Sequence, residues 1–206
     1  MNPTPYKLSY IGASLAVRES VVIAETFLAL GDWRKTEEKV KGENLIQTRT
    51  QSSLYRYYFE LAPRLQGLTE EQLTLLVEGT VQEQKYLLWY AICKHYAFIR
   101  EFAVEVLHEK YLVFDFALTE FDYERFFNRK ADWHEELAQL KDSSRVKMRT
   151  MLFRMLRDGG LVNQAHVILP ALLSRRLVEA LQGDAPWSAP SGGFEIFPVS
   201  LAEITA

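Results

Sequence analysis

The sequence predicts an all-α protein: one compact multi-helix domain with a helix-turn-helix-like N-terminal part and a basic C-terminal helix. Three observations carry this prediction. Apolar residues recur at helical spacing along most of the chain. Glycine and proline are sparse before residue 182, and capping signals separate one apolar run from the next.

The N-terminal third is predicted to form three helices. The first covers about residues 18–30 and ends near Gly31, and the second covers residues 33–41 with Gly42 as its stop. The third covers residues 51–65. Its predicted core face carries four large side chains: Leu54, Tyr58, Leu61 and Leu65. Its opposite face carries Ser53, Arg56, Glu60 and Arg64.

The middle of the chain is predicted to be helical as well. Thr69 and Gln72 have the spacing of a capping box, which marks the start of a fourth helix. Residues 81–111 are rich in aromatic side chains and are expected to form two consecutive helices, and residues 122–130 a short one. We expect one group of side chains to be buried in the core, rather than to stack on a ligand: Tyr86, Trp89, Tyr90, Cys93, Tyr96 and Phe98.

The C-terminal part ends in less regular structure. Ser144 is predicted to cap a strong helix that ends at Gly159 and Gly160. A final helix is expected over residues 170–181, followed by a loop over residues 182–193. Residues 194–199 are the one candidate β element, although they have no obvious partner strand.

Charge is distributed unevenly over three regions, which we expect to form one compact unit. The N-terminal helical region is residues 1–66, the acidic helical core region residues 67–142, and the basic C-terminal region with its loop tail residues 143–206. Residues 67–142 carry eight basic and fifteen acidic side chains, whereas residues 143–176 carry seven basic side chains and one acidic. The net charge of −3 hides this asymmetry, which is more informative about partners than the total.

No catalytic, cofactor or metal site is predicted. The chain has no glycine-rich nucleotide loop and no nucleophile elbow, and its histidines lack the spacing of metal ligands. His134 is expected to be a surface histidine, and Cys93 an unreactive buried thiol. The longest stretch without a charged side chain, residues 159–174, falls short of the ~20 apolar residues of a membrane span. We therefore expect a cytoplasmic binding protein rather than an enzyme.

The helix after Ser144 is the most informative segment. Its apolar stripe consists of Met148, Met151, Leu152, Met155 and Leu156. The remaining surface is almost purely cationic, and such a face repels itself unless an anion such as phosphate is supplied. The predicted phosphate contacts in this basic region are Arg145, Lys147, Arg149, Arg154, Arg157, Arg175 and Arg176.

A second contact surface is predicted at the start of the third helix. Two short helices, a turn and a third helix resemble a helix-turn-helix, whose last helix contacts bases or phosphates with its N-terminal residues. The side chains in question are Arg49, Gln51, Ser52, Ser53 and Arg56. Spacing alone leaves two interpretations open: nucleic-acid binding, or a scaffold that docks acidic proteins.

At these residues the chain resembles the BrxA family, the small component of BREX bacteriophage-exclusion systems. Residues 44–53 and 147–156 carry the most specific part of the likeness, which runs from about residue 6 to 181. Shorter matches lie at residues 19–20, 32–33, 64–65 and 93–94.

The resemblance implies a cytoplasmic helical protein, likened to the antitermination factor NusB. It also implies work beside a DNA methyltransferase, a large ATPase and a phosphatase-like protein. It supplies no catalytic residue. Together with the charge pattern, it favours an accessory protein that binds double-stranded DNA. The alternatives are an assembly adaptor of the same system and RNA binding in the manner of NusB.

Overall fold

Helices make up nearly all the regular structure of residues 4–184 and 193–200, the part of the chain that the computed structural model describes. Within these residues there is no strand, only two isolated antiparallel bridges, Ala117 with Val167 and Val162 with Ile168. The all-α prediction is confirmed.

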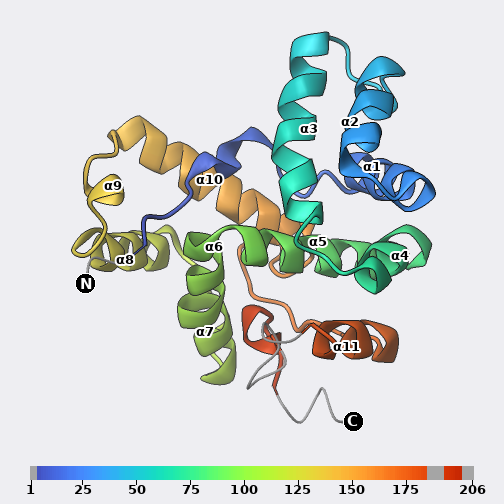
Figure 1. The fold of residues 1–206 in the computed structure, drawn as a ribbon. Coiled ribbons are helices and arrows are strands. Elements are labelled where there is room, and N and C mark those ends of the chain that lie inside the picture. Colours follow the sequence, from blue (N-terminus) through green and yellow to red (C-terminus); the bar gives the residue numbers. More distant parts are fainter. Residues whose placement is uncertain (1–3, 185–192, 201–206) are drawn as a thin grey trace.

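The three N-terminal helices begin and end close to the predicted residues (Figure 1). They are α1 (Val17–Leu30), α2 (Trp33–Gly42) and α3 (Gln51–Leu65). Gly31 ends α1 in a left-handed conformation, which glycine adopts without a steric penalty. The Asp32 carboxylate then caps α2 by accepting hydrogen bonds from the backbone amides of Arg34 and Lys35.

The central helices follow the capping signals. Thr69 and Gln72 form the predicted capping box at the start of α4 (Glu70–Glu78), and α5 (Val81–His95) begins with a capping box of its own. The chain turns at Tyr96, so the two consecutive helices predicted here are confirmed. The second of these helices is continuous but contains a π-helical stretch. It consists of α6 (Ala97–Phe102), the π-helix η2 (Ala103–His108) and α7 (Glu109–Leu112).

Two C-terminal helices differ from the prediction at their starts. The last four helices are α8 (Glu120–Ala131), α9 (Glu135–Ala138), α10 (Asp142–Asp158) and α11 (Arg175–Gln182). Ser144 lies inside α10, whose N-cap residue is Lys141, without a side-chain cap. α11 begins five residues after Pro170, because Ser174 caps it by accepting a hydrogen bond from the Leu177 amide.

The predicted β element at residues 194–199 is wrong. Phe194–Ile196 form a short 3-10 helix, η3, and Phe197 and Val199 are buried beside it. The Ile196 carbonyl accepts a hydrogen bond from the Trp89 indole at 2.9 Å, so this segment is anchored on α5 instead of pairing with a strand. An alternation of apolar residues gives the same pattern for a strand as for an irregular buried segment.

One contiguous hydrophobic core joins the elements. It contains side chains from the N-terminal, central and C-terminal regions alike, although the division into those three regions stays a prediction. The aromatic residues expected in the core are all buried, as is Cys93, and burial raises the pKa of the Cys93 thiol well above its usual value. Cys93 is thus a small hydrophobic residue and not a nucleophile.

Candidate nucleic-acid interface

The apolar stripe of α10 packs as predicted. Met148, Leu152, Met155 and Leu156 are buried, and Met151 is half-buried against the core. The α10 backbone is therefore fixed, and its polar side chains point outward or toward neighbouring elements. The environment of each cation then depends on which element faces it.

The first half of α10 is not the open cationic face that the sequence suggests. Arg149 binds Glu124 at 2.9 Å and Glu120 at 3.0 Å, both from α8. Arg145 pairs with Glu124 as well and donates a hydrogen bond to Asn128 at 2.7 Å. These two arginines join α8 to α10, because Glu120 and Glu124 of α8 supply their carboxylate partners.

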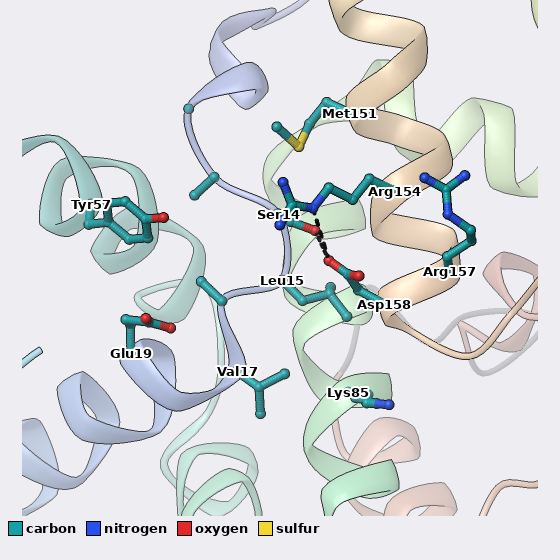
Figure 2. Close-up of a pocket in the computed structure, with 13 residues that line it drawn as sticks. Ser14, Leu15, Val17, Glu19, Tyr57, Lys85, Met151, Arg154, Arg157 and Asp158 are labelled. Carbon is teal, nitrogen blue, oxygen red and sulfur yellow. Dashed lines mark hydrogen bonds and ion pairs between the residues drawn. The ribbon is translucent and has the colours of Figure 1, made fainter. Parts of the chain in front are cut away.

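The second half of α10 borders a cleft of about 570 Å³ (Figure 2). Arg154 and Arg157 line it from α10, Lys85 from α5, and Tyr57 from α3. Most of the remaining wall is the chain segment that joins η1 (Ser9–Gly12) to α1. Lys147 lies about two helical turns before Arg154 on α10, and its side chain is exposed. Three cations thus line one cleft, and an exposed cation lies nearer the start of α10.

Asp158 and Glu19 also line this cleft and reduce its positive charge. Asp158 accepts a hydrogen bond from the Ser14 hydroxyl, and one of its oxygens lies 3.6 Å from Arg154 Nε. The Arg154 side chain is still 62% exposed, so this contact does not enclose its guanidinium. Arg157 Nη1 lies 3.0 Å from His166 Nε2, which turns that guanidinium toward the loop after α10.

The start of α3 provides the second set of predicted residues. Arg49, Gln51, Ser52 and Arg56 are exposed there. Ser53 is half-buried, and its hydroxyl accepts a hydrogen bond from the Thr50 hydroxyl at 3.0 Å. The Thr50 side chain in turn caps α3 by accepting a hydrogen bond from the Ser53 amide at 3.2 Å. Eight residues, 43–50, connect α2 to α3, which is longer than the 3–4-residue turn typical of a helix-turn-helix. The helix-turn-helix interpretation stays a prediction.

Tyr57 connects the two sets of residues. Tyr57 follows Arg56 on α3, and the Arg56 guanidinium carbon lies 5.9 Å from the centre of the Tyr57 ring. Tyr57 also lines the same cleft as Arg154 and Arg157. The cleft therefore lies between α3 and α10. Sequence reasoning missed Tyr57 and Lys85, because a single tyrosine or lysine on an amphipathic helix carries no signal of its own.

Arg175 and Arg176 are separate from the other predicted contacts. They begin α11, which packs on α4, on the side of the molecule away from α3 and α10 (Figure 1). Arg175 pairs with Glu179 at 2.8 Å, and Arg176 lines a different pocket with Glu71. Proximity along the chain to α10 does not bring these arginines to the same surface.

Arg64, expected on the polar face of α3, is buried. Its guanidinium donates to the carbonyl oxygens of Ala13 and Ser14 at 3.0 and 2.7 Å and pairs with Glu60 at 2.6 Å. These bonds hold the segment that forms the cleft wall. A guanidinium has five donors, which suits it to fix an extended chain segment.

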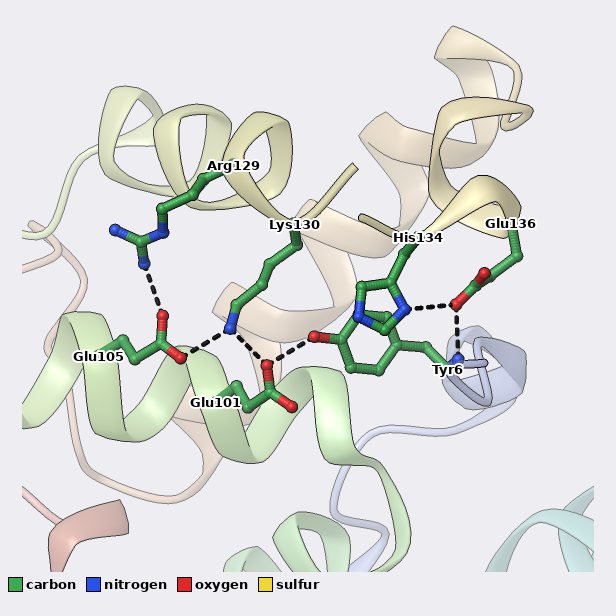
Figure 3. A network of polar contacts seen from close by, with 7 residues as sticks. All are labelled: Tyr6, Glu101, Glu105, Arg129, Lys130, His134 and Glu136. Carbon is green, nitrogen blue, oxygen red and sulfur yellow. Dashed lines mark hydrogen bonds and ion pairs between the residues drawn. The ribbon is translucent and has the colours of Figure 1, made fainter. Parts of the chain in front are cut away.

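A polar network holds the other end of the same N-terminal segment (Figure 3). The Tyr6 amide donates to Glu136 at 2.6 Å, and the Tyr6 hydroxyl donates to Glu101 at 2.5 Å. His134 stacks on the Tyr6 ring at 3.9 Å and contacts Glu136 at 2.9 Å. The prediction of a surface histidine is wrong, since the packing of Tyr6 buries His134.

The described residues hold no group of three or more histidine, cysteine, aspartate or glutamate side chains that could bind a metal ion. None of the helices described is both long and apolar enough to cross a membrane. What the site offers is therefore a set of fixed or exposed cations with hydroxyl and amide groups, which suits contacts to phosphate oxygens.

The family profile and the curated relatives that match this chain all carry the name BrxA. A BrxA family profile matches residues 4–184. The BREX protein BrxA of Escherichia coli O9:H4 (strain HS) is 31% identical over 187 residues, covering 84% of this chain and 88% of that protein. The BREX protein BrxA of Bacillus cereus (strain H3081.97) is 28% identical over 126 residues, covering 61% and 63%. The crystal structure of an uncharacterized protein from Magnetospirillum magneticum shares the fold, with a TM-score of 0.71, 22% identity and coverage of 87% and 93%.

Proposed function

Because the chain belongs to the BrxA family, we propose that it is a non-enzymatic, DNA-binding component of a BREX phage-exclusion system. One observation carries the DNA part of the proposal: Arg154, Arg157 and Lys85 surround one cleft between α10 and α3. Location in the cytoplasm stays a prediction, as does work beside the methyltransferase, ATPase and phosphatase-like components.

The proposal assigns phosphate contacts to the cations that lack a strong carboxylate partner. Arg154 Nε lies 3.6 Å from the Asp158 carboxylate and the Arg154 side chain is mostly exposed, and Lys147 is exposed as well. Phosphate contacts at such side chains release condensed counterions, which is the main driving force of non-specific DNA binding. Arg145 and Arg149 contribute less, because their charges are already matched by Glu120 and Glu124.

The start of α3 supplies a second line of contacts in this proposal. Arg49, Gln51 and Ser52 are exposed, and Arg56 lies beside the Tyr57 wall of the cleft. Exposed arginine and glutamine side chains are the types that contact base edges in the major groove. The cleft would then position the duplex, and α3 would lie closest to its bases.

Mobility shifts over a salt series test the proposal. The wild-type protein is mixed with duplex DNA, duplex RNA and single strands. We expect the tightest binding to duplex DNA, with an affinity that falls as salt rises. If the protein binds no duplex DNA even at ~50 mM salt, where electrostatic binding is strongest, the DNA proposal is wrong. Preference for duplex RNA would favour the NusB-like alternative.

Two charge-matched variants separate the cleft from general surface charge. Arg154→Glu with Arg157→Glu should abolish duplex binding, because both residues line the cleft. Arg175→Glu with Arg176→Glu changes the net charge equally on α11 and should leave binding nearly unchanged. Equal losses in both would mean that binding follows total charge and not this interface. Circular dichroism of each variant verifies that the helices are intact.

A further inference from the structure

The chain leaves an exposed apolar tip, residues 112–116, at the end of α7. Leu112, Val113, Phe114 and Phe116 are all exposed, and Phe114 is the most exposed of them at 80%. Most exposed apolar side chains on a soluble protein are scattered singly, and a contiguous group is typical of an interaction site. Figure 1 shows α7 extending to the side of the molecule away from α3 and α10.

The backbone at Phe114 supplies an independent observation. Phe114 has a φ of +61°, in the left-handed region. Its amide donates to the Tyr111 carbonyl at 3.1 Å, and the next amide, of Asp115, donates to the Lys110 carbonyl at 2.9 Å. This is the Schellman ending of a helix, in which the left-handed position is usually glycine. A phenylalanine there combines backbone strain with an exposed ring, a combination that neither folding nor solubility favours.

The tip is also held in place. The Phe116 carbonyl accepts a hydrogen bond from the Ile168 amide at 2.7 Å, and the Leu118 amide donates to the His166 carbonyl at 2.9 Å. The Phe114 and Phe116 rings meet edge to face, with centres 6.2 Å apart. An aromatic side chain that is already ordered loses little entropy when a partner covers it, as at the centre of many protein interfaces.

The charges beside the tip are predominantly negative. Lys110 Nζ is shared between Asp115 at 2.5 Å and Asp122 at 3.4 Å, and the Lys110 side chain is only 14% exposed. Glu109 adds an exposed carboxylate. These charges repel DNA phosphates, and in a symmetric contact between two copies they would face each other. They complement a partner with lysine or arginine around its contact surface.

We propose that residues 112–116 dock a protein partner that offers an apolar pocket bordered by lysine or arginine side chains. Phe114 inserts into the pocket, and Glu109 and Asp115 face the basic border. Because the end of α7 lies on the side of the molecule away from α3 (Figure 1), a protein docked there leaves the start of α3 open to DNA. The docking site does not depend on the proposed DNA binding, and each can fail without the other.

Site-specific photocrosslinking in cells that carry the complete defence system tests the proposal. The photoreactive residue p-benzoylphenylalanine replaces Phe114, and in a control it replaces Trp133, which is exposed to a similar degree, 75%. We expect an adduct from position 114 with one other protein of the system, at a peptide rich in lysine or arginine. We also expect Glu109→Lys to weaken that adduct and position 133 not to form it. An adduct between two copies of this chain, the same adduct from position 133, or no adduct overturns the proposal.

Phe114→Gly then separates docking from folding. Glycine suits the left-handed position, so the thermal midpoint should stay unchanged or rise. The partner identified by crosslinking is then purified without the crosslink, and its affinity for Phe114→Gly should be lower by about tenfold or more than its affinity for the wild type, as for the loss of an aromatic anchor. Duplex DNA affinity of the same variant should match the wild type. A lower thermal midpoint with unchanged partner affinity would show that Phe114 serves the fold, which overturns the proposal.

Discussion

The two halves of α10 carry arginines in equal number but in different environments. Arg145 and Arg149 lie against α8 and pair with Glu120 and Glu124. Arg154 and Arg157 border the cleft beside the N-terminal segment, where the Asp158 carboxylate lies 3.6 Å from Arg154 Nε. A count of charges along one helix therefore cannot identify a binding face, because neighbouring helices decide which cations are already neutralised.

The strongest test of this difference exchanges arginine for glutamine in each half separately. Arg154→Gln with Arg157→Gln should lower duplex DNA affinity by about 60-fold at ~0.1 M salt, if each residue makes one phosphate contact worth about 0.9 in the slope of log affinity against log salt. Arg145→Gln with Arg149→Gln should change the affinity by less than about threefold, because those charges are already paired. Mobility shifts over a salt series measure both. Equal losses would remove the distinction between the halves.

A second test increases the positive charge of the half of α10 that carries Arg154 and Arg157. Asp158→Asn removes the negative charge near Arg154 but keeps an acceptor for the Ser14 hydroxyl. The affinity for duplex DNA should rise, by up to about eightfold at ~0.1 M salt, the equivalent of one additional contact. Ser14→Ala, which leaves the charge in place, is the control and should not raise it. An unchanged affinity in Asp158→Asn would mean that Arg154 does not approach phosphate.

A third test removes an α8 carboxylate from the half of the α8–α10 contact in which Arg145 and Arg149 are paired. Glu124→Gln leaves Arg145 and Arg149 poorly paired at a junction where all three side chains are less than one-third exposed. The free energy of unfolding should fall by about 1–2 kcal/mol, and the thermal midpoint by about 2–8 °C. Glu179→Gln is the control, since its partner Arg175 is almost fully exposed and solvent screens the pair, so the thermal midpoint should hardly change. Thermal unfolding compares the two, and equal midpoints would count against a structural role for Glu124.

The same contrast explains which features of α10 could be predicted from sequence. Periodicity identified the buried stripe of α10 around Met148 and Leu152, since the helical repeat determines which side chains share a face. It could not foresee that Arg149 would meet Glu120 and Glu124, nor that Arg175 would lie on another side of the molecule. The DNA contacts themselves stay predictions that the experiments above address.

Local sequence determined most of the helices, because their signals act over a few residues, although it missed α9 and misplaced the starts of α10 and α11. The capping box of Thr69 and Gln72, the glycine after α1 and the spacing of apolar side chains each involve neighbours along the chain. Tertiary structure alone decided the burial of Arg64 and His134, the irregular packing of Phe194–Ile196 and the cleft between α3 and α10. Each of these depends on groups far apart in sequence, such as Arg64 with Ala13 or Tyr6 with Glu136. Local periodicity carries no information about such contacts, because it specifies which face of a helix is apolar but not which element will cover it.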